Sequence, residues 1–230
     1  MFVSANDKRI GNHHADFFDR SHAPLCSKMP RQTVSVNYAE VFMPIIIGIA
    51  GGSASGKSTF TDTLANRLSD IRTAVFHMDS YFKSHDELPR SVSPVSGKVY
   101  ADYNLPESFE LQRLRDDLAN VIDADTVIVE GLFTLWDDTL CRLLDMKLFV
   151  DCRADERIVR RLRRNMTYGM SFDEIAEVYL DLVRFRHDEF VEPSRSRADL
   201  IINGSADFDS PAGIVAEHIR QLLKLSGKYS

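Results

Sequence analysis

The sequence predicts a three-layer α/β fold: a mostly parallel five-stranded sheet with helices on both faces. Short β-branched runs alternate with segments of helical periodicity from residue 44 onward. A strand, a helix and a second strand in that order form a parallel unit with a right-handed crossover. A chain of 230 residues favours one domain, with a core large enough to need no disulfide or metal support.

Five apolar runs have the composition of buried strands. In chain order they cover 45–49, 73–77, 126–130, 147–151 and 200–202. Apolar residues at helical spacing predict the helices that alternate with them. These cover 57–68, 106–122, 154–166, 172–190 and 211–225. Residues 83–106 are rich in Ser, Pro and Asp, and we expect one long loop there, functional or disordered.

Residues 1–42 show no sustained period and carry scattered charges and histidines. We expect a flexible N-terminal extension there, or an upstream start, ahead of one domain over 43–230. The histidines of the extension lack the Cys/His spacing of a metal site.

Composition excludes several classes of partner. The net charge is −6, whereas a dedicated nucleic-acid binder is usually basic. The longest apolar run, 42–50, contains Pro44 and is far shorter than the roughly 20 residues of a membrane helix. Three cysteines fit a reducing compartment, so we expect a cytoplasmic protein. We therefore expect no nucleic-acid or membrane partner, and self-association into a homo-oligomer stays open.

The turn after the first strand matches the phosphate-binding motif G-x-x-x-x-G-K-[ST]. Glycines let successive N–H groups face phosphate oxygens, and the N-terminus of the following helix adds partial positive charge. We expect Lys57 to reach the β- and γ-phosphates of ATP and the Ser58 hydroxyl to bind Mg²⁺. A plain Gly/Ser turn is the alternative. The predicted ATP-binding residues are Gly51, Gly52, Ser53, Ala54, Ser55, Gly56, Lys57, Ser58 and Thr59.

Two acidic residues follow neighbouring strands of the predicted sheet. Glu130 ends the third strand and is the second candidate ligand of Mg²⁺. Asp79 follows the second strand, where open α/β sheets bind ligands, and is the candidate to position or deprotonate an acceptor hydroxyl. A solvent-facing strand end and a turn or cap aspartate are the respective alternatives. We expect His77 to pack within its strand.

Four arginines of the helix over 154–166 share one face, at spacings i, i+3, i+4 and i+7. Such a stripe in an acidic chain suits an arginine-rich lid that clamps triphosphate oxygens and neutralises transition-state charge. A solvated helix face and an RNA-binding patch are the alternatives. The stripe consists of Arg157, Arg160, Arg161 and Arg164.

Taken together, these motifs resemble the uridine kinase/phosphoribulokinase family. Residues 46–58 look like the P-loop of that family, and Glu130-Gly131 matches the Glu-Gly after its third strand. Asp79-Ser80-Tyr81-Phe82 looks like the family's Asp-Ser-aromatic-aromatic segment, whose Asp activates the acceptor hydroxyl. Residues 103–109 are similar to the segment that lines the nucleoside site, and residues 154–161 resemble the lid of uridine–cytidine kinases. The match runs over about 44–225.

The resemblance implies a P-loop kinase domain that transfers the γ-phosphate of ATP, with Mg²⁺, to a hydroxyl of a small molecule. Uridine and cytidine are the acceptors it implies. Asp79, Lys57, Arg160, Arg161 and Arg164 would be catalytic. The residues on the acceptor side would be Asp79, Phe82, Tyr103, Asn104 and Arg157.

The sequence departs from the family at the positions that bind the acceptor there. Asn104 stands where uridine kinases have an Asp that holds ribose hydroxyls, and Phe82 replaces a tyrosine. The family inserts a base-gripping hairpin with a Tyr and a His before the third strand, where this chain has only residues 123–125. The resemblance therefore supports the reaction type more than the acceptor. Another ribosyl or sugar-like acceptor is the alternative, and a non-catalytic nucleotide-binding regulatory module is the rival from another class.

Overall fold

The structure, a computed structural model, describes residues 43–227, so the extension expected over 1–42 lies outside the described residues. Five parallel strands form the central sheet in the order β2-β5-β1-β6-β7. Their bounds are β1 Ile45–Gly51, β2 Thr73–His77, β5 Thr126–Glu130, β6 Met146–Asp151 and β7 Leu200–Asn203. The predicted α/β class and all five predicted strands are confirmed.

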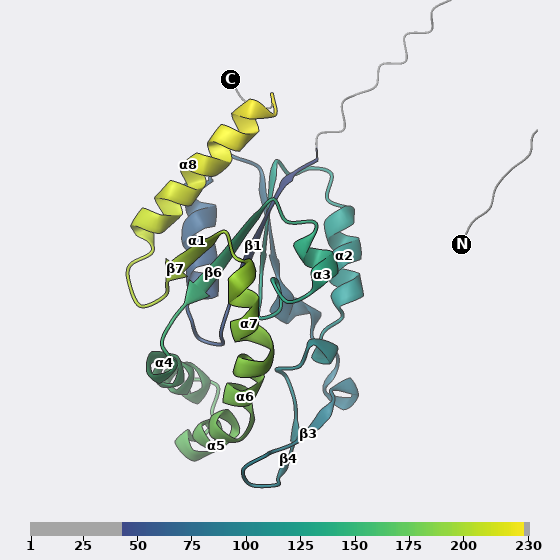
Figure 1. Cartoon of the computed structure of the whole chain (residues 1–230), viewed down its shortest axis with the longest axis vertical. Helices are drawn as coiled ribbons and strands as arrows, with labels where there is room; N and C mark the ends of the chain where they lie inside the picture. The colour runs from purple at the N-terminus through teal and green to yellow at the C-terminus, as the bar shows by residue number, and fades with distance from the viewer. Residues whose placement is uncertain (1–42, 228–230) are drawn as a thin grey trace, which may run out of the picture. The chain divides into compact units, whose positions relative to one another are not determined.

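Helices cover both faces of the sheet, as Figure 1 shows. On one face, α1 (Lys57–Arg67) and α8 (Asp209–Leu225) pack on strand residues such as Ile47 and Ile49. The other face carries α2 (Leu111–Ala119) and α3 (Asp138–Cys141), which pack on Val127 and Val129. Each strand contributes alternate residues to the two cores because successive side chains point to opposite faces. None of the helices described is long and apolar enough to cross a membrane.

The C-terminal helical region begins with the predicted helix α4 (Ala154–Met166). The sequence predicts one α-helix over 172–190. The structure has a helical run there, but two π turns interrupt it, so the prediction of a single α-helix is wrong. The run begins at a capping box on Ser171 and continues to residue 197. Its members are α5 Phe172–Val178, π-helix η4 Tyr179–Val183, α6 Arg184–Arg186, π-helix η5 His187–Val191, α7 Glu192–Ser194 and 3₁₀-helix η6 Arg195–Arg197.

The single long loop expected over 83–106 is also wrong. The connection from β2 to α2 contains an antiparallel hairpin of β3 (Arg90–Val92) and β4 (Val99–Ala101). Its strands are three residues long, and Val92 and Val99 are exposed, so no apolar alternation marks them in the sequence. Short 3₁₀ turns η2 (His85–Glu87) and η3 (Pro106–Ser108) flank the hairpin.

Backbone contacts hold the two ends of the connection between β2 and α2 together. Phe82 and Phe109 form an isolated antiparallel bridge. The Lys83 amide donates to the Ser108 carbonyl at 2.9 Å, and the Glu110 amide donates to the Tyr81 carbonyl at 2.8 Å. Because Phe109 is held extended, α2 starts at Leu111 rather than at residue 106 as predicted.

Polar contacts tie the hairpin to the helical run over 172–197. The buried Asp102 carboxylate accepts hydrogen bonds from Arg186 Nε at 2.9 Å and Ser91 Oγ at 2.8 Å. Tyr100 donates to Glu177 and to Asp181 at 2.9 and 2.8 Å, and Lys98 pairs with Glu177. The hairpin, α4 and α5 therefore gather at the end of the sheet where the strands finish (Figure 1).

Candidate active site

The loop between β1 and α1 has the backbone of a phosphate cradle. Gly56 precedes α1 with φ of 101°, a left-handed conformation that glycine adopts without strain. Ala54 has φ of 62° and is the only non-glycine residue of 43–227 with positive φ. No side chain caps the N-terminus of α1, and its first turn holds no acidic residue. Its amides are therefore free to donate to an anion, as the motif predicts.

The loop between β1 and α1 meets α4 and η5 at Gly52. A Cβ at Gly52 would lie 2.5 Å from Arg157 Nη1 of α4 and 3.0 Å from His187 Cε1 of η5. Arg157 is only 5% exposed, and its Nε donates to the Cys152 carbonyl at 3.0 Å. The glycine thus lets a buried guanidinium and an imidazole reach the phosphate loop.

Lys57 interacts electrostatically with Glu130 and Asp79 at the carboxyl edge of the sheet. Lys57 Nζ donates to the Gly52 carbonyl at 3.3 Å, so its ammonium folds over the loop. Loss of water around Lys57 lowers its pKa, while the carboxylates of Glu130 and Asp79 act in the opposite direction. The structure therefore brings these three residues, which lie on different elements, into one site.

The contacts of Glu130 suit a carboxylate that binds a metal ion. It is 4% exposed, and its Oε1 accepts a hydrogen bond from Ser58 Oγ at 3.1 Å. His77 is the last residue of β2, as expected, and its Nδ1 lies 2.9 Å from the same oxygen. No group of three metal-ligating His, Cys, Asp or Glu side chains occurs in the described part of the chain. One carboxylate and one hydroxyl fit Mg²⁺, which keeps waters and binds substrate phosphates.

Asp79 lies in the 3₁₀ turn η1 (Met78–Tyr81) directly after β2, with surface exposed to solvent. Partial loss of water raises the pKa of its carboxyl, the nearby Lys57 lowers it, and Glu130 raises it further. Gly131 makes this neighbourhood possible, because a Cβ there would lie 2.3 Å from Met78 Cβ. An exposed carboxylate beside a lysine at the edge of the sheet can accept a proton from a bound hydroxyl.

Besides Arg157, two further arginines of the stripe reach the phosphate loop. Arg160 Nη1 donates to the Gly204 carbonyl at 2.8 Å and to the Ser55 carbonyl at 3.4 Å. Arg161 Nη1 donates to Ser53 Oγ at 3.0 Å. Arg164 is more exposed, and its Nε bonds Asn165 Oδ1 at 3.2 Å. Arg157, Arg160 and Arg161 of the stripe therefore face the loop, while Arg164 lies at the surface.

Arg161 carries a charge without a carboxylate partner among the described residues. Burial lowers its pKa, Arg164 lowers it further, and its Nε is buried without a hydrogen bond. A partly buried guanidinium without an anionic partner is unfavourable until an anion arrives.

We expect the Arg161→Met variant to bind ATP about 10- to 150-fold more weakly, because a charge-assisted hydrogen bond to a phosphate is worth about 1.5–3 kcal/mol. The melting temperature of the ligand-free protein should not fall, because the substitution removes an uncompensated charge. Calorimetric titration with ATP and thermal unfolding without ATP measure the two effects. Wild-type ATP affinity, or a lower melting temperature, would contradict this account of Arg161.

Three of the residues predicted on the acceptor side, Phe82, Tyr103 and Asn104, lie in two separate places. The Phe82 and Tyr103 rings pack edge to face at 5.4 Å, and His85 Nδ1 lies 2.9 Å from the Tyr103 hydroxyl. Asn104 is separate from these rings and lines a small cavity together with Ser53 and Arg157. The hairpin connection thus contributes both an aromatic group and an amide to this end of the sheet.

Sequence reasoning missed two residues that contact the site or its surroundings. His85 lies within the segment expected to be a loop. His187 lies within an expected helix and carries no motif, so no local signal identifies it. Only the chain's folding brings His187 to Gly52.

Comparisons with known proteins agree with the geometry. The family model described as Phosphoribulokinase / Uridine kinase family matches residues 103–209. A uridine kinase of Clostridium botulinum (strain Kyoto / Type A2) is 32% identical over 207 residues, covering 79% of this chain and 98% of that protein. A uridine kinase of Bacillus cereus (strain AH187) is 33% identical over 185 residues, 69% of this chain and 85% of that protein.

Two solved structures share the fold. A phosphoribulokinase from Rhodobacter spheroides superposes with a TM-score of 0.52 at 15% identity, over 72% of this chain and 74% of that chain. A candidate fructose transport system kinase from Silicibacter sp. TM1040 gives a TM-score of 0.54 at 20% identity, over 76% of this chain and 92% of that chain. At these identities the likeness concerns the fold.

Proposed function

The chain belongs to the phosphoribulokinase/uridine kinase family of ATP-dependent small-molecule kinases, and we propose that it phosphorylates a hydroxyl of uridine or cytidine. The observation that carries the reaction type is the meeting of Lys57, Glu130 and Asp79 at the phosphate loop. One lysine and two carboxylates there supply the charges that phosphoryl transfer requires. We place the activity in residues 43–230 and expect a cytoplasmic enzyme.

The proposed ATP site consists of the 51–56 amides, Lys57, Thr59 and the arginines Arg160, Arg161 and Arg164. Lys57 would bind the β- and γ-phosphates, and the arginines would neutralise charge that develops on the transferred group. Ser58 and Glu130 would hold Mg²⁺, which neutralises phosphate charge when bound. His77, at 2.9 Å from Glu130, would orient that carboxylate.

The proposed acceptor site lies between the hairpin connection and the helical run over 172–197. Asp79 would accept the proton of the attacking hydroxyl, with Arg157 and Asn104 binding the rest of the acceptor. Phe82 and Tyr103 present an aromatic surface that suits a base or a sugar face. The absence of the family's base-gripping hairpin before β5 favours, as the second candidate, another ribosyl or sugar-like acceptor.

The test is ADP release by the purified protein with Mg-ATP and a panel of acceptors. The panel holds uridine, cytidine, adenosine, nicotinamide riboside, ribose, ribulose 5-phosphate and pantothenate. We expect uridine or cytidine to stimulate release. A response to a different acceptor alone would keep the reaction and overturn the substrate. ATP binding without stimulation by any acceptor would contradict the proposal and favour a regulatory module.

A further inference from the structure

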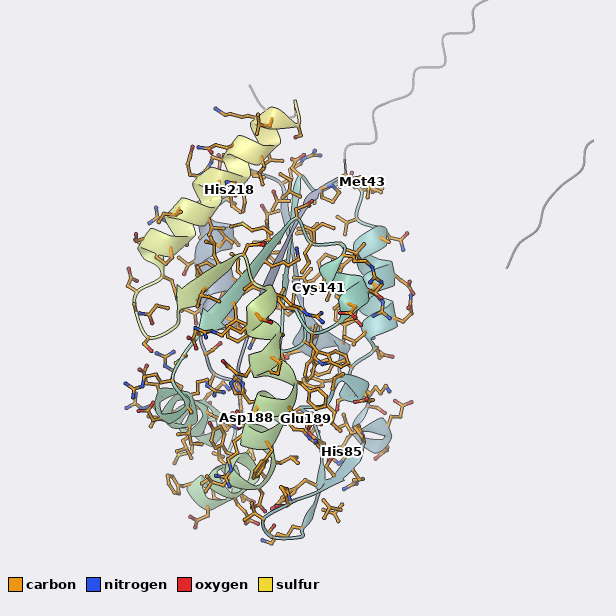
Figure 2. The ribbon with its side chains drawn as sticks, viewed as in Figure 1. Met43, His85, Cys141, Asp188, Glu189 and His218 are labelled. Carbon is orange, nitrogen blue, oxygen red and sulfur yellow. The ribbon has the colours of Figure 1, made fainter. Side chains whose placement is uncertain are left out.

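His187 is a buried imidazole that faces the candidate site from the second π turn. Its side chain is 11% exposed, and its Cε1 atom faces Gly52 of the phosphate loop. It follows Arg186, which holds the hairpin through Asp102, and precedes Asp188 and Glu189 of the same π turn, which are labelled in Figure 2. π turns within α-helices occur frequently at functional sites.

The surroundings of His187 keep its ring neutral. Burial, together with the positive charges of Arg157 and Lys57, lowers its pKa to about 4. A neutral imidazole has one N–H donor and one acceptor nitrogen. Nε2 lies 3.4 Å from Glu192 Oε2, so the proton belongs on the nitrogen that faces a carboxylate. Nδ1 is then the acceptor.

Nδ1 has no hydrogen-bond partner among the residues the structure describes, although it is buried. A buried acceptor without a partner is unfavourable until a donor reaches it. His187 lines a partly open cavity of ≈ 10 Å³ with Ser53, Asn104 and Arg157. That volume is about the space that one water-sized oxygen occupies. The cavity therefore has room for one hydroxyl group, with polar groups on several sides.

We propose that Nδ1 of His187 accepts a hydrogen bond from a second hydroxyl of the acceptor, one that is not phosphorylated. His187 is then a specificity residue that selects polyhydroxylated acceptors such as ribosides and sugars. This inference rests on the proposed function for the identity of the acceptor but concerns a different atom of it. The carboxylate of Asp79 receives the reacting hydroxyl, and His187 fixes the orientation of the molecule that carries it.

Two variants separate this role from a structural one. In His187→Asn, the side-chain oxygen takes the position of Nδ1, whereas in His187→Gln the amide reaches the position of Nε2. We expect His187→Gln to weaken acceptor binding about 5- to 100-fold, the effect of leaving one buried group unpaired. His187→Asn should stay within about 3-fold of wild type, because it keeps a comparable hydrogen bond. The KM for ATP and the melting temperature should change little in both variants.

Binding is measured by calorimetry with a non-hydrolysable ATP analogue present, using uridine, 2′-deoxyuridine, 3′-deoxyuridine, ribose and 2-deoxyribose. One deoxy compound should bind wild type more weakly than its parent, and His187→Gln should lose that preference while His187→Asn keeps it. ADP release on the parent compounds is measured in parallel.

The outcomes separate this inference from the proposed function. Binding that follows the expected pattern without turnover would support His187 and contradict the proposed reaction. Turnover with equal effects of the two variants would overturn the role of His187 and leave the reaction standing. Equal loss of ATP and acceptor affinity, or lowered melting temperatures in both variants, would assign His187 to structure. Failure of all five compounds to bind wild type would overturn the inference.

Discussion

Replacing Asp79 by asparagine should lower the turnover number about 10²–10⁴-fold, the usual contribution of a positioned acid or base. The amide can still hold the acceptor through its oxygen but cannot take its proton. ATP affinity should stay within about 2-fold of wild type, because the phosphate contacts come from other residues. Steady-state kinetics and calorimetric titration with ATP measure the two quantities.

The pH profile gives a second readout of Asp79. Since loss of water raises its pKa, the ionised form is lost at a higher pH than for a free aspartate as the solution is acidified. The acidic limb of kcat/KM should therefore reflect this raised pKa and disappear in Asp79→Asn. Asp86, an exposed aspartate on the same connection, offers the matched control, and Asp86→Asn should leave turnover and profile unchanged. Near-normal turnover of Asp79→Asn would remove Asp79 from the mechanism.

Replacing Asp102 by alanine should lower the free energy of unfolding by about 3–5 kcal/mol, the effect of removing one partner of a buried ion pair. The Asp102 side chain is 0% exposed and accepts from Arg186 Nε, Ser91 Oγ and the Asn104 amide at 2.9, 2.8 and 2.9 Å. All three donors lose this partner in the variant. For a chain of this size the melting temperature should fall by about 6–20 °C.

The control uses a second ion pair that joins the same two parts of the molecule. Lys98 and Glu177 link the hairpin to α5, but both side chains are substantially exposed. Exposed ion pairs contribute little to stability, so Lys98→Met should cause a much smaller fall. Urea unfolding measures both variants. A similar small effect of the two substitutions would show that the Asp102 contacts do not hold the hairpin.

The five central strands could be predicted because burial on both faces makes their sequences continuously apolar. Val127, Ile128 and Val129 of β5 are all fully buried, and such runs are characteristic of parallel sheets. The hairpin could not be predicted in this way. Its strands are short, and contacts such as Tyr100 with Asp181 replace apolar packing. The π turns were equally hidden, because helical periodicity predicts a helix without distinguishing a local π turn from α-helical turns.

The phosphate side of the candidate site was accessible from sequence because its geometry is local. The glycines, Lys57 and Ser58 follow one another along the chain, and the structure places Glu130 against Ser58 as the strand order requires. The acceptor side was less accessible, because it depends on tertiary packing. His187 reaches Gly52 only through the course of the helical run, and Asn104 lines the same cavity as Arg157 only because of the course of the hairpin connection.

The backbone bridge between Phe82 and Phe109 affects how such a protein can evolve. The segment between these residues leaves and rejoins the domain at nearly one point, so its length can vary without displacing β2 or α2. Doubling the length of a flexible loop costs only about 0.6 kcal/mol of closure entropy. The segment also carries Tyr103 and Asn104, whereas the phosphate loop lies elsewhere. On the proposed function, selection for a new acceptor can therefore change this segment while the residues proposed to bind ATP stay the same.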